Sequence, residues 1–135
     1  MANALYPLWK QELMQFAANN NLSAGTVKVA LIDTGTYTYS AAHQFWSSAS
    51  AASVGTPQTL TGKSFTNGVF DSTTNPTFTA VTGNSVEALI IYIDTGAAGT
   101  SPLVAYIDTS VTGLPVTPNG GDISITFNAS GIFAL

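Results

Sequence analysis

The sequence predicts an all-β protein, an antiparallel β-sandwich or jelly-roll-like domain with one N-terminal amphipathic α-helix. About eight short segments rich in β-branched and aromatic residues are separated by Gly, Asn and Pro turn signals. Three of the apolar runs end in the same triplet, Ile-Asp-Thr, which is typical of a core strand leaving a sheet for a turn. We expect a single domain, 1–135, with the helix in 1–22, the sandwich in 26–135, and a loop or arm near 37–57.

The N-terminal segment is the only one with helical spacing of apolar residues. Asn3 is in position to cap a helix running from Leu5 to Asn20, and Pro7 falls in its first turn, where a missing N–H costs little. Such a helix either covers a sheet face or docks on a neighbouring subunit. Its residues at spacings of four, four and three make one apolar stripe: Leu5, Trp9, Leu13 and Phe16.

The β segments follow in short succession. Segment 85–94 is the most hydrophobic and is predicted to be the central strand, joined to 103–108 in an antiparallel hairpin. Asn67-Gly68 predicts a tight hairpin turn, and 112–121, with two prolines and a Gly-Gly pair, predicts a loop. The predicted strands are 26–33, 59–66, 69–71, 76–81, 85–94, 103–108, 122–127 and 131–135.

The β pattern is interrupted after the first strand. Ser40 is a candidate cap for a short helix that carries His43, Phe45 and Trp46. The Ser/Ala tract 47–53 that follows has side chains too small to fill a core, so we expect a surface loop or arm.

Charged residues are scarce. They make up 7% of the chain, against roughly 25% in an ordinary soluble domain. With three lysines, no arginine and a net charge of −4, the chain lacks the basic patch that nucleic-acid binding requires. A polar but nearly neutral surface fits either a small independent β domain or a subunit that packs into an assembly.

Other absences narrow the class further. With no cysteine, the chain has no disulfide, thiolate nucleophile or Cys-based metal site, and its redox compartment stays open. We expect no secretory signal, because the N-terminus has neither a basic nor an apolar region. We also expect no membrane span, since the longest apolar run, 88–93, is far shorter than the ~18 residues required.

Catalytic and metal-binding patterns are weak, and we expect a non-enzymatic protein without cofactor or metal. His43 is the single histidine, and no Gly-x-Ser-x-Gly motif accompanies it. The three strand-terminal carboxylates Asp33, Asp94 and Asp108 could converge on a Ca²⁺ ion at one rim of the sandwich. Without an Asp-x-Asp-x-Asp-Gly loop, separate Asx-turn hydrogen bonds are the favoured interpretation.

Long stretches of the chain resemble a family of small structural proteins of tailed bacteriophages. The resemblance covers most of the sequence. It is carried by Met1-Ala-Asn-Ala-Leu-Tyr6, Val27-Lys-Val-Ala-Leu-Ile-Asp-Thr34, Leu60-Thr-Gly-Lys63, Phe78-Thr-Ala-Val-Thr-Gly83, Val86-Glu-Ala-Leu-Ile-Ile-Tyr-Ile-Asp-Thr95, Leu103-Val-Ala-Tyr-Ile-Asp-Thr109 and Gly113-Leu-Pro-Val-Thr-Pro-Asn-Gly-Gly-Asp-Ile123.

The resemblance implies a virion protein, a head decoration (cement) protein on the capsid exterior whose partner is the major capsid protein. Proteins of this kind are commonly β-rich homotrimers. The alternative is a glycan- or receptor-binding module of a phage tail or surface, since Tyr37, Tyr39 and Trp46 are aromatic residues suited to stacking on a sugar ring. The candidate capsid or subunit contacts are Leu5, Trp9, Leu13, Phe16, Tyr37, Tyr39, Phe45 and Trp46.

Overall fold

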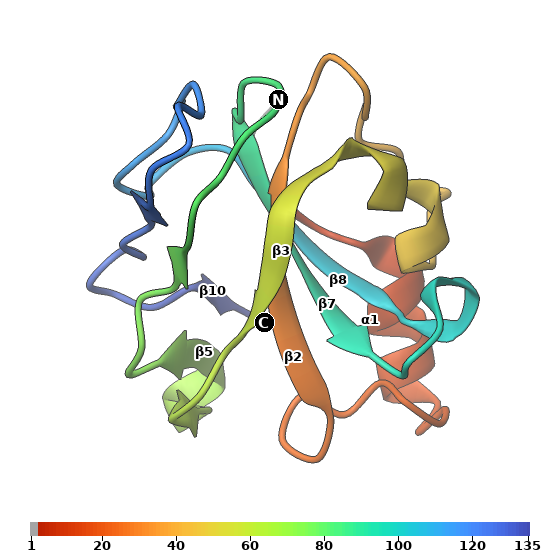
Figure 1. The fold of residues 1–135 in the computed structure, drawn as a ribbon. Helices are drawn as coiled ribbons and strands as arrows, with labels where there is room; N and C mark the ends of the chain where they lie inside the picture. Colours follow the sequence, from red (N-terminus) through yellow and green to blue (C-terminus); the bar gives the residue numbers. More distant parts are fainter. Residues whose placement is uncertain (1–2) are drawn as a thin grey trace.

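The computed structural model describes residues 3–135, so Met1 and Ala2, the first residues of the predicted 1–22 segment, lie outside the described residues. The fold is an antiparallel β-sandwich-like domain with one α-helix, which confirms the predicted class (Figure 1). A five-stranded sheet has the order β1-β8-β7-β2-β3. Its strands are β1 (Ala4–Leu5), β2 (Thr26–Ile32), β3 (Ser53–Thr59), β7 (Ala88–Asp94) and β8 (Leu103–Ile107).

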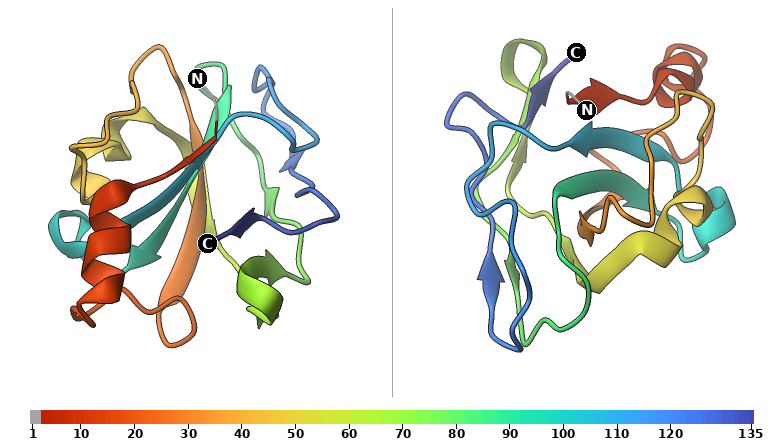
Figure 2. Two further views of the ribbon diagram at one scale, coloured as in Figure 1. Left: turned by 180° about the vertical axis from the view of Figure 1, so that it is seen from behind. Right: turned by 90° about the horizontal axis from the view of Figure 1, so that it is seen from above.

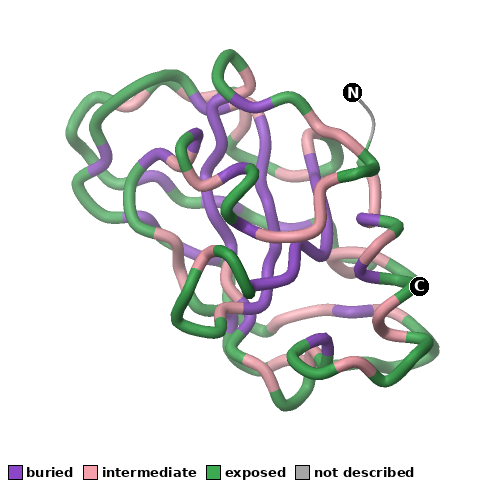
Figure 3. The backbone as a smooth tube through the Cα atoms, turned by 90° about the vertical axis from the view of Figure 1, so that its right-hand side faces the viewer, coloured by how far each residue is buried: buried purple, intermediate pink, exposed green. Residues whose placement is uncertain are grey.

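The centre of this sheet is β7, as predicted. It pairs with β2 from Ala88↔Ile32 to Asp94↔Thr26 and forms the predicted antiparallel hairpin with β8. The residues of β7 and β8 are buried at nearly every position, so both faces of these strands are covered. Buried stretches of the chain run through the middle of the molecule (Figure 3). A strand covered on both faces needs apolar residues at every position, which explains why its sequence is continuously hydrophobic instead of alternating.

A layer of short strands lies beside this sheet (Figure 2). One group has the order β10-β5-β4 and the other pairs β6 with β9. The predicted strands 59–66, 76–81 and 122–127 are much shorter here. Beyond the pairing of β6 with β9, side chains replace the ladder: Asp122 accepts the N–H of Ala80, and Asn75 accepts the N–H of Phe127. The strands are β4 (Lys63–Ser64), β5 (Val69–Ser72), β6 (Thr77–Phe78), β9 (Ile123–Ser124) and β10 (Phe133–Ala134).

The helix is shorter than predicted at both ends. It spans α1 (Pro7–Met14) and packs beside β8, while Ala4 and Leu5 pair with β8 as a strand. Asn3 does not cap it. The Asn3 side chain accepts the N–H groups of Asp108 and Thr109 at 2.7 and 2.9 Å, so the segment before the helix is fixed to the end of β8 instead.

Segment 37–57 begins as a loop over residues 37–44, as expected, but it is not a surface arm. Tyr37, Trp46, Ala49 and Ala52 are buried in the main core, and the segment continues into β3. Small side chains fill a core where backbone segments approach closely, so the Ser/Ala tract packs as two 3₁₀ turns. No helix starts at Ser40; its hydroxyl accepts the Ala42 N–H in a turn. The 3₁₀ turns of the chain are η1 (Trp46–Ser48), η2 (Ser50–Ala52), η3 (Thr66–Gly68) and η4 (Ala98–Thr100).

Candidate functional site

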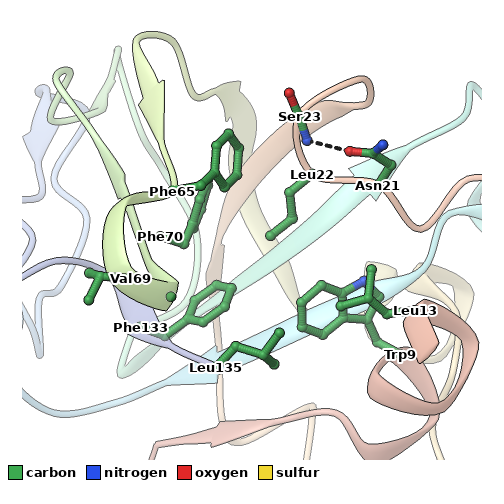
Figure 4. Close-up of a pocket in the computed structure, with 11 residues that line it drawn as sticks. Trp9, Leu13, Asn21, Leu22, Ser23, Phe65, Val69, Phe70, Phe133 and Leu135 are labelled. Carbon is green, nitrogen blue, oxygen red and sulfur yellow. Dashed lines mark hydrogen bonds between the residues drawn. The ribbon is translucent and has the colours of Figure 1, made fainter.

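An apolar groove of about 320 Å³ lies between α1 and the short strands (Figure 4). Its polar side chains, Asn21 and Ser23, belong to a local turn in which the Asn21 carboxamide accepts the Ser23 N–H at 2.8 Å. An exposed apolar hollow of this kind is typical of a docking surface. The groove is lined by Trp9, Leu13, Asn21, Leu22, Ser23, Phe65, Gly68, Val69, Phe70, Phe133 and Leu135.

Aromatic contacts build the wall of the groove from distant parts of the chain. The Phe133 ring lies 5.2 Å from the Phe70 ring and 6.0 Å, edge-on, from the Trp9 ring. Phe65 stacks on Phe70 at 5.6 Å. Pairing of β10 with β5 holds Phe133 opposite Phe70. The groove therefore forms only when the C-terminal strand docks on β5.

Lys63 fixes the opposite wall. Its ammonium group donates hydrogen bonds to the carbonyl oxygens of Leu22 at 2.6 Å, Gly25 at 2.7 Å and Ser23 at 3.3 Å. One side chain on β4 thus satisfies three carbonyls of the loop before β2 and sets the position of Leu22. One of the three lysines of the chain therefore serves to shape the groove.

The end of α1 presents two further apolar side chains. The N–H groups of Phe16 and Ala17 donate to the carbonyls of Leu13 and Glu12 at 3.2 and 3.0 Å, the pattern of a Schellman motif. This motif places Phe16 in the left-handed region, at φ 55°, where glycine is favoured. The Phe16 side chain is nevertheless 97% exposed, and that of Met14 is 79% exposed.

A second concavity, the tyrosine hollow, has a volume of about 490 Å³. Rings pack closely around it: Tyr39 lies 5.7 Å from Tyr106 and 5.1 Å from Tyr6. Burial, followed by the charges of Asp108, Tyr37 and Glu87, raises the pKa of Tyr106. The hollow is lined by Thr34, Tyr37, Thr38, Tyr39, Glu87, Tyr106, Asp108, Thr109 and Pro115.

Behind the hollow, a hydrogen-bond chain runs from the core toward the surface. The Tyr6 and Tyr37 hydroxyls are 2.8 Å apart, and the Tyr37 hydroxyl lies 2.9 Å from His43 Nδ1. Burial and the bond to Tyr37 raise the pKa of Tyr6 far above its usual range. The Tyr37 hydroxyl therefore bonds to both Tyr6 and the His43 ring.

The three strand-terminal carboxylates do not meet at one rim. Because β7 runs antiparallel to β2 and β8, Asp94 lies beside Thr26 at the start of β2, whereas Asp33 and Asp108 follow the other ends. Asp33 accepts the Gly35 N–H, the Thr36 hydroxyl and the Asn84 amide, and Asp94 accepts the Gly96 N–H and pairs with Lys28 at 2.9 Å. Among residues 3–135, no group of three or more His, Asp or Glu residues is placed to hold a metal ion.

The predicted contact residues separate into three groups. Trp9 and Leu13 line the groove, and Tyr37 and Tyr39 line the hollow. The remaining side chains do neither. Leu5 is half-buried in β1, Phe16 is exposed beyond the helix, Phe45 is half-buried beside Pro102, and Trp46 is buried with its ring 4.3 Å from that of Tyr92.

Sequence reasoning missed most of the residues that line the groove and most of those that line the hollow. Phe65 and Phe133 were not singled out, because neither lies in a long periodic segment. The apolar C-terminal segment 131–135 was a usable signal, since such a strand must cover something. Glu87 and Tyr106 were hidden within strands that matched the pattern of a buried core.

No protein-family model matches the sequence, and no curated protein matches it either. Among residues 3–135, the single α-helix is too short to cross a bilayer.

Proposed function

We propose that this chain is a non-enzymatic structural protein of a tailed-bacteriophage virion, a decoration (cement) protein. In this proposal it binds the major capsid protein on the outer surface of the assembled head and stabilises the shell. A protein that binds only the assembled lattice adds its binding free energy to the stability of that lattice. Its surface must therefore supply apolar and backbone contacts, and needs no reaction centre.

Phe16 is the observation that carries the proposal. A non-glycine residue in the left-handed region costs roughly 1–2 kcal/mol, and an exposed aromatic ring gains nothing from burial in the isolated chain. Glycine at this position would relieve the strain and remove the exposed ring. Together with Met14, which is 79% exposed on the last turn of the helix, the Phe16 ring supports burial of this helix end against a partner.

The apolar groove and the scarcity of charge support the same docking mode. The two polar side chains lining the groove already belong to a local turn, and its rim carries Phe65 and Leu135, 43% and 67% exposed. Charged residues at 7% leave few groups to be desolvated when a large surface is covered. The sequence resemblance to phage structural proteins supplies the identity of the partner.

The direct test compares Phe16→Gly with the wild-type chain on assembled heads that lack the protein. Burial of a phenylalanine side chain is worth roughly 1.5–3 kcal/mol, so head occupancy is expected to require at least about tenfold more protein. Asn19→Gly is the matched control. Asn19 is also exposed with a positive φ, 69°, but carries no apolar ring. Undiminished occupancy with Phe16→Gly would contradict this docking mode.

Self-association must be separated from capsid binding. We propose that the chain is a homotrimer, and sedimentation of the isolated protein measures this directly. If Phe16→Gly lowers the mass of the isolated protein, Phe16 belongs to the contact between copies, not to the capsid contact. Labelling the protein in purified particles then places it on the head, as proposed, or on the tail.

The alternative function is a glycan- or receptor-binding module, for which the sequence offered three aromatic residues to stack on a sugar ring. The structure leaves two of them, because Trp46 is buried. The Trp46 ring is stacked on Tyr92 with an interplanar angle of 4° and is 8% exposed, so it is committed to packing. Of the three aromatic residues named for this function, Tyr37 and Tyr39 are left, and both line the tyrosine hollow. A glycan array with hits that survive Trp46→Ala and disappear with Tyr39→Ala would favour this function over decoration.

A further inference from the structure

The tyrosine hollow is separate from the apolar groove, since no residue lines both. Its polar side chains are also of a different kind. Every polar side chain that lines it carries oxygen: the hydroxyls of three tyrosines and three threonines, and the carboxylates of Glu87 and Asp108. Lysine, arginine, histidine and amide side chains are missing from its lining. The hollow is therefore rich in hydrogen-bond acceptors and carries negative charge.

The carboxylate of Glu87 is held in place at this site. It accepts hydrogen bonds from the N–H of Thr34 at 3.0 Å and from the Thr34 hydroxyl at 2.8 Å. Burial raises the pKa of Glu87, but the hydrogen bonds from Ser85 and Thr34 outweigh it, so the pKa lies below its usual value and the group is ionised at neutral pH. A charge fixed in this way favours a ligand of opposite sign.

Three classes of ligand can be compared against this lining. An anion is repelled by the two carboxylates. A neutral sugar stacks on tyrosine, but it brings as many acceptors as donors and gains little from the charge. A guanidinium group has five N–H donors and no acceptor, stacks its plane on aromatic rings, and is charged at every physiological pH. Only the guanidinium matches the donors, the charge and the aromatic surface together.

We propose that the tyrosine hollow binds an arginine side chain supplied by a partner protein, stacked on Tyr39 and bonded to Glu87 and Asp108. The source must be another polypeptide, because this chain contains no arginine. Two of its three lysines are engaged elsewhere, Lys28 with Asp94 and Lys63 with loop carbonyls. The net charge of −4 favours the approach of a basic partner.

The test uses the full chain and two small probes. N-acetyl-arginine amide is titrated against the isotopically labelled protein, with N-acetyl-citrulline amide as the neutral isostere. We expect saturable shifts in the NMR signals of Thr34, Tyr39 and Thr109, and binding of the arginine probe at least about fivefold tighter, because charge-assisted hydrogen bonds are stronger than neutral ones. Added salt should weaken the arginine titration alone.

Matched variants locate the effect. Glu87→Gln keeps an acceptor for Thr34 and removes the charge, so arginine affinity should fall while the fold is retained. Glu12→Gln, which removes a charge on α1 away from the hollow, should bind like the wild type. Equal binding of arginine and citrulline, or binding of a methyl glycoside without any arginine response, would overturn the proposal.

This inference does not require the capsid assignment. The probes report on the isolated chain, whereas Phe16→Gly reports on heads. Arginine binding with no head occupancy would leave the hollow as a protein-recognition site on a different target. Head occupancy with no arginine response would preserve the decoration function and reject the hollow as a contact.

Discussion

β7 is hydrogen-bonded to β2 and β8 along its length, whereas β10 meets β5 at two residue pairs only. The central strands β2, β7 and β8 of the five-stranded sheet are held by long ladders and by side chains buried on both faces. The layer of short strands is held by individual side-chain hydrogen bonds and tightly packed turns. Both candidate sites depend on irregular segments: the groove on the short strands, and the hollow on the loop between β2 and β3.

The layer of short strands can be altered for function more easily than the five-stranded sheet. A ladder buried on both faces leaves few side chains able to contact a partner; Tyr106 of β8, which lines the tyrosine hollow, is an exception. A layer held by local contacts exposes its outer residues, and its hollows can change shape with few substitutions. The two regions should therefore respond differently to mutation.

The largest expected effect is in the central strand. Ile91→Ala removes a fully buried side chain and should lower the free energy of unfolding by about 2–5 kcal/mol. Ile132→Ala, at a half-buried position beside β10, should cost about 1 kcal/mol, because solvent and neighbouring groups fill part of the space. Urea unfolding measures both. Equal losses would contradict the distinction between the two regions.

A smaller effect is expected at the turn before β10. Gly131 has a φ of 117°, and a Cβ there would overlap a methyl group of Val69. Gly131→Ala should therefore destabilise the protein by about 1–3 kcal/mol and displace β10 from β5. Hydrogen exchange should speed up at the N–H groups of Ile132 and Leu135, which donate to β5 and the turn before it.

The matched control for this position is Gly99→Ala. Gly99 is also in a turn, its φ is not positive, and an added Cβ meets nothing within 4 Å. It should leave both stability and exchange unchanged. If Gly131→Ala behaves in the same way, the close packing of the turn on β5 does not hold β10 in place.

Lys63→Met tests how much the hydrogen bonds at the other wall of the groove stabilise the layer of short strands. The substitution keeps the length of the side chain and removes the donor to three carbonyls, so stability should fall by about 1–3 kcal/mol. Lys10→Met, on exposed α1, is the control and should change stability little. Urea unfolding curves give the free energy of unfolding of both variants. Equal free energies would mean that water replaces the Lys63 ammonium group at the three carbonyls without loss of stability.

The smallest expected effect is the loss of stability at acid pH, caused by the carboxylates of Asp33 and Asp94 at the ends of β2 and β7. The hydroxyl of Thr36, the amide of Asn84 and the N–H of Gly35 hold the pKa of Asp33 below its usual value of 3.8. The hydrogen bond from Lys28 and the N–H of Gly96 do the same for Asp94. When folding lowers the pKa of a carboxyl group, its ionised form stabilises the folded protein. This stabilisation is complete at a pH above the pKa of the group in the unfolded chain, and it is lost as the pH falls through the pKa in the folded protein.

Stability should therefore be level above about pH 5 and decline below pH 4. Asp33→Asn should reduce the slope of that decline, measured as the urea midpoint between pH 5 and pH 2. Asp122→Asn, an exposed position in the short-strand layer, is the comparison variant. An unchanged slope with Asp33→Asn would show that its hydrogen bonds do not depend on ionisation.

The sequence predicted the three central strands of the large sheet better than any other part, whereas it missed the edge strands β1 and β3. Thr26 to Ile32, the central β7 and its hairpin with β8 were recognisable because long apolar runs of β-branched residues have few alternatives. The Asx turns after β2 and β7 were equally readable, since Asp followed by Thr-Gly has a local mechanism: Asp33 accepts the N–H of Gly35 and Asp94 that of Gly96. These features depend on neighbours in the chain, which is why the chain alone determines them.

The helix shows where local reasoning stops. The spacing of Leu5, Trp9, Leu13 and Phe16 was real, yet Leu5 became a strand and Phe16 turned outward. Leu5 pairs with Ala105 of β8 and therefore belongs to a strand. At the other end, the Schellman motif ends the helix two turns after Pro7. The β8 partner of Leu5 lies about a hundred residues away in the chain, and the Schellman motif has phenylalanine where glycine is usual, so periodicity alone could not set these boundaries.

The sequence by itself determined the fold class, the central strands and a surface poor in charge. Tertiary structure alone decided which residues share a site. The Trp9 ring contacts the ring of Phe133, near the other end of the chain. Glu87 and Asp108 line one hollow with Tyr39, although the three residues lie in separate segments of the sequence. Local preferences are additive along a chain, but contacts between distant residues depend on the packing of the whole, and both candidate sites consist of such contacts.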